Sequence, residues 1–288
     1  MSRIAYVNGA YTPHREGAVH IEDRGYQFAD GVYEVITVLH GTLIDEEPHL
    51  DRLDRSLSEL DIKWPVQRRA LKVILRQIIR RNHLKNGVVY FQITRGVAPR
   101  QFEYPKDTAG SLVVTAKHMP KMAKATGPGP KGFSVITLPD IRWKRRDIKT
   151  TGLLASCMAK QKAKEAGVDD AWMVDDAGYV TEGTSNNAWI VTRDNELVTR
   201  NISNDILSGI TRMRILKIAE SQGLKVVERA FTPDEVKQAR EAFISSASTF
   251  VKPVTNIDGT SIGNAQMGVL SEALLKGIYD FMENSKAD

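Results

Sequence analysis

The sequence has a single cysteine, Cys157, and no histidine after His118. One cysteine cannot form an intramolecular disulfide, which excludes a disulfide-stapled secreted domain and favours a reducing compartment. The second half of the chain therefore lacks the ligands of a Cys/His zinc site and the base of a Ser-His-Asp triad. We expect no metal centre, and chemistry in the second half must use lysine, carboxylates, tyrosine or backbone groups.

Long apolar runs are also missing. No stretch approaches membrane-spanning length, and the first residues lack the apolar core of a signal peptide, so we expect a cytoplasmic protein. Of the 288 residues, 42 % are apolar and 26 % are charged, which is ordinary for a globular chain of about two domains. The formal net charge of +5 suits an anionic cofactor or substrate as well as nucleic acid.

Hydrophobic periodicity predicts a mixed α and β protein. Helices are predicted at 49–60, 70–84, 153–167, 206–223 and 270–282. Strands are predicted at 31–39, 88–94, 112–116, 133–138, 170–174 and 226–231. Residues 119–131 are rich in Pro, Gly and Lys and are typical of a linker, which divides the chain into residues 1–120 and 121–288.

The stretch Asp140–Leu154 concentrates positive charge in a segment that reads as strand-like and turns at Gly152 into a helix. Lys149 lies there among Arg142, Lys144, Arg145 and Arg146. Cationic neighbours or desolvation lower the pKa of a lysine, which makes its amine a nucleophile towards carbonyls. Taken alone, the stretch is more typical of a basic, solvent-exposed strand edge.

Three further features are candidates for chemistry. Glu182 ends a strand beside small polar residues, where a carboxylate could hold a protonated ring nitrogen, although a solvated turn residue is the commoner meaning. The run Ser208–Thr211 opens a helix, whose free N–H groups suit an anion as well as simple capping. The run Ser245–Thr249 offers hydroxyl groups after a strand, or is merely a loop.

Several motifs, spread in order along nearly the whole chain, resemble those of the D-amino acid aminotransferases, which are fold type IV (class IV) pyridoxal-phosphate enzymes. The motifs are DRGYQF (23–28), DGVYEV (30–35), HLDRL (49–53), YFQITRG (90–96), DIRW (140–143), DIK (147–149), VTEG (180–183) and LSGITR (207–212). The resemblance implies a two-domain fold with a smaller N-terminal α/β domain and a larger C-terminal barrel-like α/β domain that binds the cofactor.

The resemblance also implies roles for individual residues. Lys149 would hold pyridoxal 5'-phosphate as a Schiff base and then move a proton between the substrate and the cofactor. Glu182 would pair with the pyridine nitrogen, and Arg52 would bind the phosphate group. The remaining cofactor contacts would come from Leu207, Ile210, Thr211, Ser246 and Ala247.

On the substrate side, the resemblance assigns the α-carboxylate to Tyr33 and Arg100. In the family, the loop that carries the arginine reaches across from a neighbouring subunit, which implies a homodimer. The family pattern places a histidine two residues after this arginine, whereas Phe102 stands there in this chain. Losing a hydrogen bond to a charged group costs about 1.5–3 kcal/mol, so we expect weaker binding or an altered substrate range.

The function implied is transamination between a D-amino acid such as D-alanine and a 2-oxo acid such as 2-oxoglutarate. Branched-chain L-amino acid aminotransferases, (R)-amine transaminases and aminodeoxychorismate lyases share the fold and are alternatives. A basic nucleic-acid-binding module is a further alternative from a different class, because of the cations at 142–146, but no nucleic-acid-binding motif accompanies them.

Overall fold

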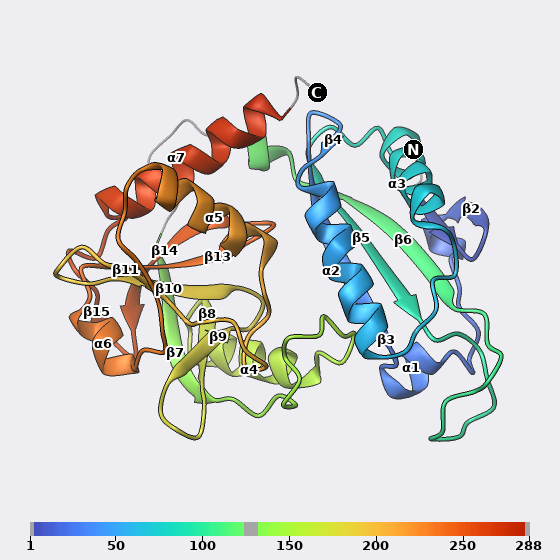
Figure 1. The fold of residues 1–288 in the computed structure, drawn as a ribbon, viewed down its shortest axis with the longest axis horizontal. Helices are drawn as coiled ribbons and strands as arrows, with labels where there is room; N and C mark the ends of the chain where they lie inside the picture. Colours follow the sequence, from blue (N-terminus) through green and yellow to red (C-terminus); the bar gives the residue numbers. More distant parts are fainter. Residues whose placement is uncertain (1–2, 124–131, 286–288) are drawn as a thin grey trace. The chain divides into compact units, whose positions relative to one another are not determined.

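A computed structural model describes residues 3–123 and 132–285. The chain divides into two compact units, Met1–Lys124 with Ile148–Gly152 and Ala125–Asp147 with Leu153–Asp288. Each contains its own sheet (Figure 1). Most of the predicted linker at 119–131 lies outside the described residues, so the domain boundary at 120/121 stays a prediction. The segment Ile148–Gly152, which the predicted boundary would put in the second domain, is grouped with the first unit.

Within the described residues, the first unit holds a six-stranded antiparallel sheet in the order β2-β1-β6-β5-β3-β4. Its strands are β1 (Ile4–Val7), β2 (Ala10–Pro13), β3 (Gly31–Leu39), β4 (Thr42–Leu43), β5 (Gly87–Thr94) and β6 (Ser111–His118). Its helices are η1 (His14–Glu16), α1 (Arg24–Phe28), α2 (Glu46–Glu59), α3 (Arg68–Arg81) and η2 (Pro120–Ala123).

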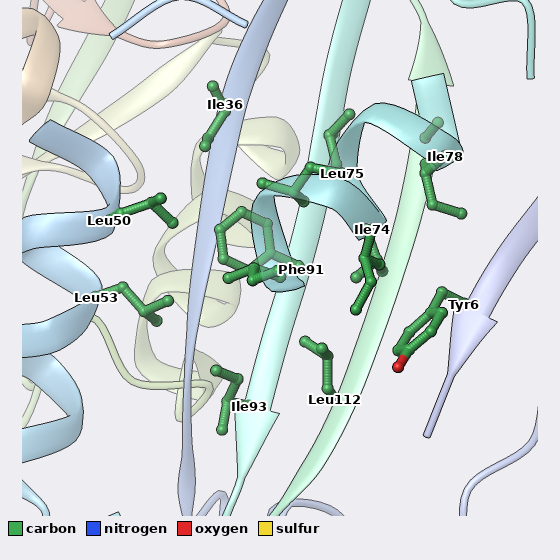
Figure 2. Packing of buried hydrophobic residues seen from close by; sticks show 14 of the residues in the cluster. Tyr6, Ile36, Leu50, Leu53, Ile74, Leu75, Ile78, Phe91, Ile93 and Leu112 are labelled. Carbon is green, nitrogen blue, oxygen red and sulfur yellow. The ribbon is translucent and has the colours of Figure 1, made fainter. Parts of the chain in front are cut away.

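The core of this unit lies between the sheet and the helices α2 and α3. Leu50 and Leu53 of α2 and Leu75 of α3 are fully buried against Ile36 and Phe91 of the sheet (Figure 2). Burying a side chain of this size contributes about 1.5–3 kcal/mol, so the buried leucines of α2 hold this helix on β3. The position of α2 matters for function because Arg52 and Ser56 lie on it.

Within the described residues, the second unit holds a nine-stranded sheet, in which β7 to β14 follow the order β12-β11-β10-β13-β14-β7-β8-β9 and β15 pairs with β14. Its strands are β7 (Phe133–Pro139), β8 (Asp170–Val174), β9 (Val180–Gly183), β10 (Asn187–Val191), β11 (Leu197–Thr199), β12 (Val226–Glu228), β13 (Glu241–Ser246), β14 (Phe250–Ile257) and β15 (Thr260–Ser261). Its helices are α4 (Leu154–Glu165), α5 (Ile210–Ser221), α6 (Pro233–Gln238) and α7 (Val269–Asn284).

A separate apolar core fills this unit. Trp172 and Phe231 meet edge to face with ring centroids 6.3 Å apart, and Val254 and Ile257 of β14 are buried in the same cluster. The strands β7 and β8 pair in parallel, and neighbouring parallel strands need a crossover connection, which here contains α4. The strands β9 and β13 of this sheet carry some of the residues predicted to bind a cofactor.

One local prediction was wrong. The residues from Asp140 to Lys149 form turns and bends and not a strand, and the only pairing described there is an isolated bridge between Thr150 and Val32. The side chains of the arginines in this stretch contact carboxylates. The predicted helix after Gly152 is confirmed as α4.

Candidate functional site

Lys149 lies in the first unit, beside the strand β3. The Tyr33 N–H donates to the Lys149 carbonyl at 3.0 Å, and the Lys149 N–H donates to Ser56 Oγ of α2 at 3.4 Å. These backbone contacts fix the lysine between a strand and a helix, although the lysine itself belongs to neither.

The side chain of Lys149 is half-buried, and its Nζ lies 4.2 Å from the centroid of the Tyr33 ring. A cation over an aromatic face is attracted by the negative quadrupole of the ring, by about 0.5–1 kcal/mol or more. Tyr33 also contacts Tyr90, with centroids 5.6 Å apart. The structure therefore brings together two of the residues predicted from the sequence, Lys149 and Tyr33.

Arg52 is held by a buried carboxylate, Glu34, for which the sequence analysis proposed no role. Glu34, on β3, has no exposed surface and accepts from Arg52 Nε at 2.7 Å and from a terminal guanidinium nitrogen of Arg52 at 2.8 Å. His49 Nδ1 lies 2.7 Å from the same carboxylate. The two-point contact fixes the plane of the Arg52 guanidinium as well as its position.

The electrostatics of this cluster favour a charged pair and a neutral imidazole. Burial alone would raise the pKa of Glu34, but Arg52 and His49 outweigh burial and lower it to about 2. Burial lowers the pKa of His49, and the attraction of Glu34 opposes that change only in part. His49 is therefore neutral at neutral pH, with its proton on Nδ1, where it donates to Glu34.

Glu182 lies in β9 of the second unit and is buried. One of its oxygens accepts from Arg142 at 2.5 Å, and the other accepts from the Asn187 side chain at 3.1 Å and from the Leu207 N–H at 3.3 Å. Burial raises the pKa of the Glu182 carboxyl, and Arg142 opposes that rise. Each of these three partners is a donor, which matches an ionised carboxylate.

Glu182 retains capacity for another donor. A carboxylate offers about four lone-pair directions, and the three donors described here use three of them. A protonated ring nitrogen is a single N–H donor, so the arrangement fits the role that the resemblance implies. Arg142 is itself held by Asp140 at 2.7 Å, and Thr181 donates to Asp140 at 2.7 Å.

Asn187 connects Glu182 with the start of α5. Its amide donates to Glu182 and also to the Leu207 carbonyl at 3.0 Å. Gly209, the N-cap residue of α5, lies so close that a Cβ there would be 2.1 Å from Asn187 Oδ1, which explains why a glycine stands at this position. Leu207, Ile210 and Glu182 are thus brought into one neighbourhood of the second unit.

The first turn of α5 contains Ile210 and Thr211. No side chain caps this end, since the N-cap is Gly209 with extended backbone angles. The first N–H groups of a helix have no partner within the helix and carry the positive end of its dipole, so this turn is suited to an anion such as phosphate. The predicted cofactor contacts Ile210 and Thr211 therefore lie at a helix end whose N–H groups can bind a phosphate.

Ser246 and Ala247 lie at the end of β13 and in the short loop before β14. Ser246 Oγ is 2.7 Å from Thr249 Oγ1, and the Thr249 N–H donates to Ser246 Oγ at 3.3 Å. The hydroxyl cluster is therefore ordered by its own contacts.

Arg100 and Phe102 lie in the loop between β5 and β6 and are exposed. The Arg100 guanidinium carbon is 4.8 Å from the centroid of the Phe28 ring, and the Phe28 and Phe102 rings have centroids 5.8 Å apart. Both predicted substrate residues of the loop therefore contact the same aromatic side chain.

The arginines between 142 and 146 do not form the open positive field that the sequence suggested. Arg142 contacts Asp140 and Glu182, Arg145 contacts Asp147, and Arg146 contacts Asp140 and Asp205. Their charge is largely compensated within the same unit, and the role of Arg142 is to fix Glu182.

Sequence reasoning did not find Glu34, His49, Asn187 or a role for Arg142 beyond charge. Of these residues, only Glu34 is marked by the sequence pattern, because it lies on the same buried face of a strand as Val32 and Ile36. A carboxylate at such a position must have a cationic partner. The sequence alone does not say that the partner is Arg52.

Comparison with known proteins decides the family. Residues 31–257 match the family described as amino-transferase class IV. The chain belongs to the class IV aminotransferases. The chain is 41 % identical over 278 residues to the D-alanine aminotransferase of Bacillus licheniformis, covering 96 % of this chain and 95 % of the relative. It is 36 % identical to that of Listeria monocytogenes serotype 4b (strain F2365), covering 93 % of this chain and 92 % of the relative.

Solved structures confirm the predicted fold of this aminotransferase. The branched-chain amino acid aminotransferase of Escherichia coli superposes with a TM-score of 0.87 at 21 % identity, over 97 % of this chain and 94 % of that one. The branched-chain aminotransferase of Thermoproteus uzoniensis, solved with norvaline, superposes with a TM-score of 0.84 at 24 % identity, over 99 % and 96 % of the two chains. The fold type IV prediction is therefore correct.

The cofactor prediction is confirmed at the level of the family. Class IV enzymes use pyridoxal phosphate, and solved branched-chain amino acid aminotransferases of the same fold are complexed with N-(5'-phosphopyridoxyl)-L-glutamate or with pyridoxamine 5'-phosphate. This aminotransferase is therefore a pyridoxal-phosphate enzyme.

Two further properties of the described residues bear on other classes of site. Within 3–123 and 132–285, no group of three or more His, Cys, Asp or Glu side chains is placed to hold a metal ion. None of the helices in those ranges is long and apolar enough to cross a membrane.

Proposed function

We propose that this aminotransferase transfers the amino group of a D-amino acid such as D-alanine to a 2-oxo acid such as 2-oxoglutarate, with pyridoxal 5'-phosphate as cofactor. The observation that carries the proposal is the match to D-alanine aminotransferases over nearly the full length of both chains, at up to 41 % identity among those compared. The two halves of the transfer would follow one another, with the first product leaving before the second substrate binds.

The side chains of the first unit fit such a cofactor. Lys149 supplies a primary amine, and Arg52 supplies a guanidinium whose plane is fixed by Glu34. Both are anchored to α2, since Lys149 contacts Ser56 one helical turn after Arg52. An amine for the aldehyde and a guanidinium for the phosphate are the groups that a phosphorylated pyridine aldehyde requires.

The side chains of the second unit fit the remaining parts of the cofactor. Glu182 would accept a hydrogen bond from the protonated ring nitrogen, since its carboxylate has a lone pair left for one more donor. The backbone N–H groups at Ile210 and Thr211 would bind phosphate oxygens, together with donors at Ser246 and Ala247. Leu207 would contact the face of the ring.

When bound, pyridoxal phosphate supplies an aldehyde that takes up the amino group and a ring that withdraws electrons from the substrate Cα. Lys149 would remove the proton from the substrate Cα as a free amine and would deliver it to C4′ of the cofactor, so it would act first as a base and then as an acid. Glu182 would keep the ring nitrogen protonated, which strengthens the electron withdrawal. Tyr33, whose ring lies beside the Lys149 amine, would help to orient the substrate carboxylate.

Arg100 would bind the α-carboxylate of the substrate, and Phe102 would line the same part of the pocket. The loop is expected to serve the site of a neighbouring copy, so we propose that the enzyme is a homodimer. A cytoplasmic location stays a prediction from the sequence.

The test is an assay of purified protein loaded with pyridoxal phosphate. We expect visible absorption that borohydride bleaches, and 2-oxoglutarate-dependent release of pyruvate from D-alanine. The Lys149→Ala variant should lose both the borohydride-sensitive absorption and turnover, whereas Lys164→Ala, on the exposed side of α4, should lose neither. Absence of cofactor absorption in the wild type would refute the cofactor assignment.

The same assay separates the alternatives. Activity with L-leucine in place of D-alanine would identify a branched-chain aminotransferase, and activity with an (R)-amine would identify an amine transaminase. Release of pyruvate from aminodeoxychorismate without a 2-oxo acid would identify a lyase. A salt-sensitive shift of random oligonucleotides by a colourless protein would instead favour nucleic-acid binding.

A further inference from the structure

The loop that carries Arg100 and Phe102 is bound by a buried arginine from a distant part of the chain. Arg24, the first residue of α1, is 3 % exposed. One of its terminal nitrogens donates to the Gln101 carbonyl at 2.6 Å and to the Glu103 carbonyl at 3.3 Å. The other lies 3.5 Å from the Phe102 carbonyl, a longer and weaker contact. Three consecutive loop carbonyls thus face one guanidinium.

Arg24 shares its carboxylate partner, Asp30, with a second buried arginine, Arg95. Asp30 accepts from Arg24 Nε at 2.7 Å and from Arg95 Nε at 2.8 Å, and the three side chains are almost completely buried. One carboxylate cannot neutralise two guanidinium groups. The remaining positive charge is met by backbone carbonyls, at Asp61 and Leu60 for Arg95 and in the loop for Arg24.

The position of the loop is therefore coupled to Arg24. Leaving a buried charge without hydrogen-bond partners is strongly unfavourable, so the loop carbonyls must stay within reach of the guanidinium. The base of the loop is held as well, since the Arg24 N–H donates to the Gly96 carbonyl at 2.9 Å and the Ala98 N–H donates to the Glu22 carbonyl at 3.3 Å. A lysine could not reproduce the fork of donors that reaches several carbonyls at once.

Phe28, the last residue of α1, extends the same support to the side chains of the loop. Its ring lies 4.7 Å from the guanidinium carbon of Arg24 and 4.8 Å from that of Arg100. Its centroid is 5.8 Å from that of Phe102, whose side chain is otherwise 85 % exposed. The helix α1 therefore presents one residue to the loop backbone and one to the two side chains predicted to face the substrate.

We propose that Arg24 and Phe28 are positioning residues that fix the loop 99–104, and that Arg24, held by Asp30, thereby sets the affinity of the enzyme for the substrate α-carboxylate. Both would act through Arg100 and Phe102 and not by direct contact with the substrate. The part of the proposal that concerns the carboxylate rests on the proposed function, whereas the anchoring of the loop does not.

The first experiment measures the loop itself. Trypsin can cut after Arg100 and Lys106, which are both exposed, and the cut sites are identified by mass spectrometry. In Arg24→Lys, we expect cleavage at these sites to be about 10-fold faster or more, because hydrogen bonds to a charged group are lost. Arg15→Lys, which changes an exposed arginine of the same unit, is the matched control and should cleave at the wild-type rate. An unchanged rate in Arg24→Lys overturns the proposal.

The second experiment measures substrate binding in the holoenzyme. For Arg24→Lys, we expect the KM for D-alanine to rise about 10-fold or more while kcat changes little, because Lys149 and the cofactor contacts are untouched. Phe28→Leu keeps the backbone contacts of Arg24 but removes the ring that packs on Arg100 and Phe102. It should raise KM and speed trypsin cleavage less than Arg24→Lys does, so it tests the proposal if Arg24→Lys does not fold. Faster cleavage with an unchanged KM would show that the loop position does not control affinity.

The two failures can be told apart. If wild-type enzyme carries cofactor but does not act on D-alanine, the proposed function is wrong and the carboxylate part of this inference falls with it. The cleavage comparison would still decide whether Arg24 anchors the loop. If wild type is active and the Arg24→Lys KM is unchanged, only the inference is wrong.

Discussion

The substitution Glu34→Gln is the most direct test of how Arg52 is held. It preserves the shape of the side chain and removes the negative charge that both Arg52 and His49 contact. Glu34 has no exposed surface, so water cannot reach Arg52 and His49 there to take over the contacts of the lost carboxylate. Removing one partner of a buried ion pair leaves the other uncompensated, which typically costs about 3–5 kcal/mol.

The size of the effect follows separately from the pKa. Arg52 and His49, acting against burial, lower the pKa of Glu34 from 4.5 to about 2. At about 1.4 kcal/mol for each pH unit, this corresponds to about 3 kcal/mol of stability at neutral pH. Because the folded-state pKa is lowered, this stability is complete above pH 4.5 and is lost as the pH falls from 4.5 towards 2.

The expected result is therefore a stability difference that depends on pH. Urea unfolding followed by circular dichroism should show wild type to be about 3 kcal/mol more stable than Glu34→Gln at pH 7. Linkage predicts that about 1 kcal/mol of this difference is lost at pH 4, and about 2 kcal/mol at pH 3. The control Glu220→Gln changes an exposed glutamate of α5 and should show a small difference that is nearly constant with pH.

Two outcomes would refute the reasoning. A difference between wild type and Glu34→Gln that stays constant from pH 7 to pH 3 would mean that the pKa of Glu34 is the same in the folded and unfolded protein, so that Arg52 and His49 do not favour its ionised form. A variant as stable as wild type at pH 7 would mean that the buried pair is readily replaced by neutral hydrogen bonds.

Two other predictions concern the cofactor contacts. Arg52→Lys should weaken the binding of pyridoxal phosphate to the apoenzyme about 10-fold or more, because the lost contact is to the phosphate group. In the same fluorescence titrations, the binding of pyridoxal, which lacks the phosphate, should weaken much less. Equal losses for both ligands would contradict the prediction. Gly209→Ala places a Cβ 2.1 Å from Asn187 Oδ1 and should displace Asn187 from Glu182. We expect it to lower the midpoint of thermal unfolding and to weaken cofactor binding, whereas Gly223→Ala, at a helix end with open space around it, should strain only the local backbone.

The helices that pack on the first sheet were predictable because each has one apolar stripe, of leucines in α2 and of leucines and isoleucines in α3. The helix α2 was predicted at 49–60 and lies at Glu46–Glu59, and α3 was predicted at 70–84 and lies at Arg68–Arg81. The stretch around Lys149 was not predictable, because its conformation depends on carboxylates that are distant in the sequence. Glu182, for example, is 40 residues from the arginine that it contacts.

The candidate site was predictable only in part, for a similar reason. The motifs indicate which residues belong to it, but the partners of those residues are set by strand register and helix placement. Glu34 meets Arg52 because the buried face of β3 packs against α2. Asn187, at the start of β10, meets Leu207 because the segment that leads into α5 lies beside the start of that strand. Neither contact follows from local periodicity. The helix α1 is not among the predicted helices, since five residues carry too little periodicity to identify.

The three cationic or anionic groups assigned to ligands share one structural device. Arg52 is paired with Glu34, and Glu182 is paired with Arg142. Arg100 lies on a loop whose backbone carbonyls contact Arg24, and Arg24 forms the third buried ion pair, with Asp30. Buried ion pairs give little net stability, because desolvation costs nearly as much as the attraction returns, and apolar replacements of the same shape are often as stable. What such pairs provide is a fixed direction for a charged group before the ligand arrives, so that binding does not have to order it. On this argument, apolar replacement of any of the three pairs should preserve the fold better than it preserves ligand affinity.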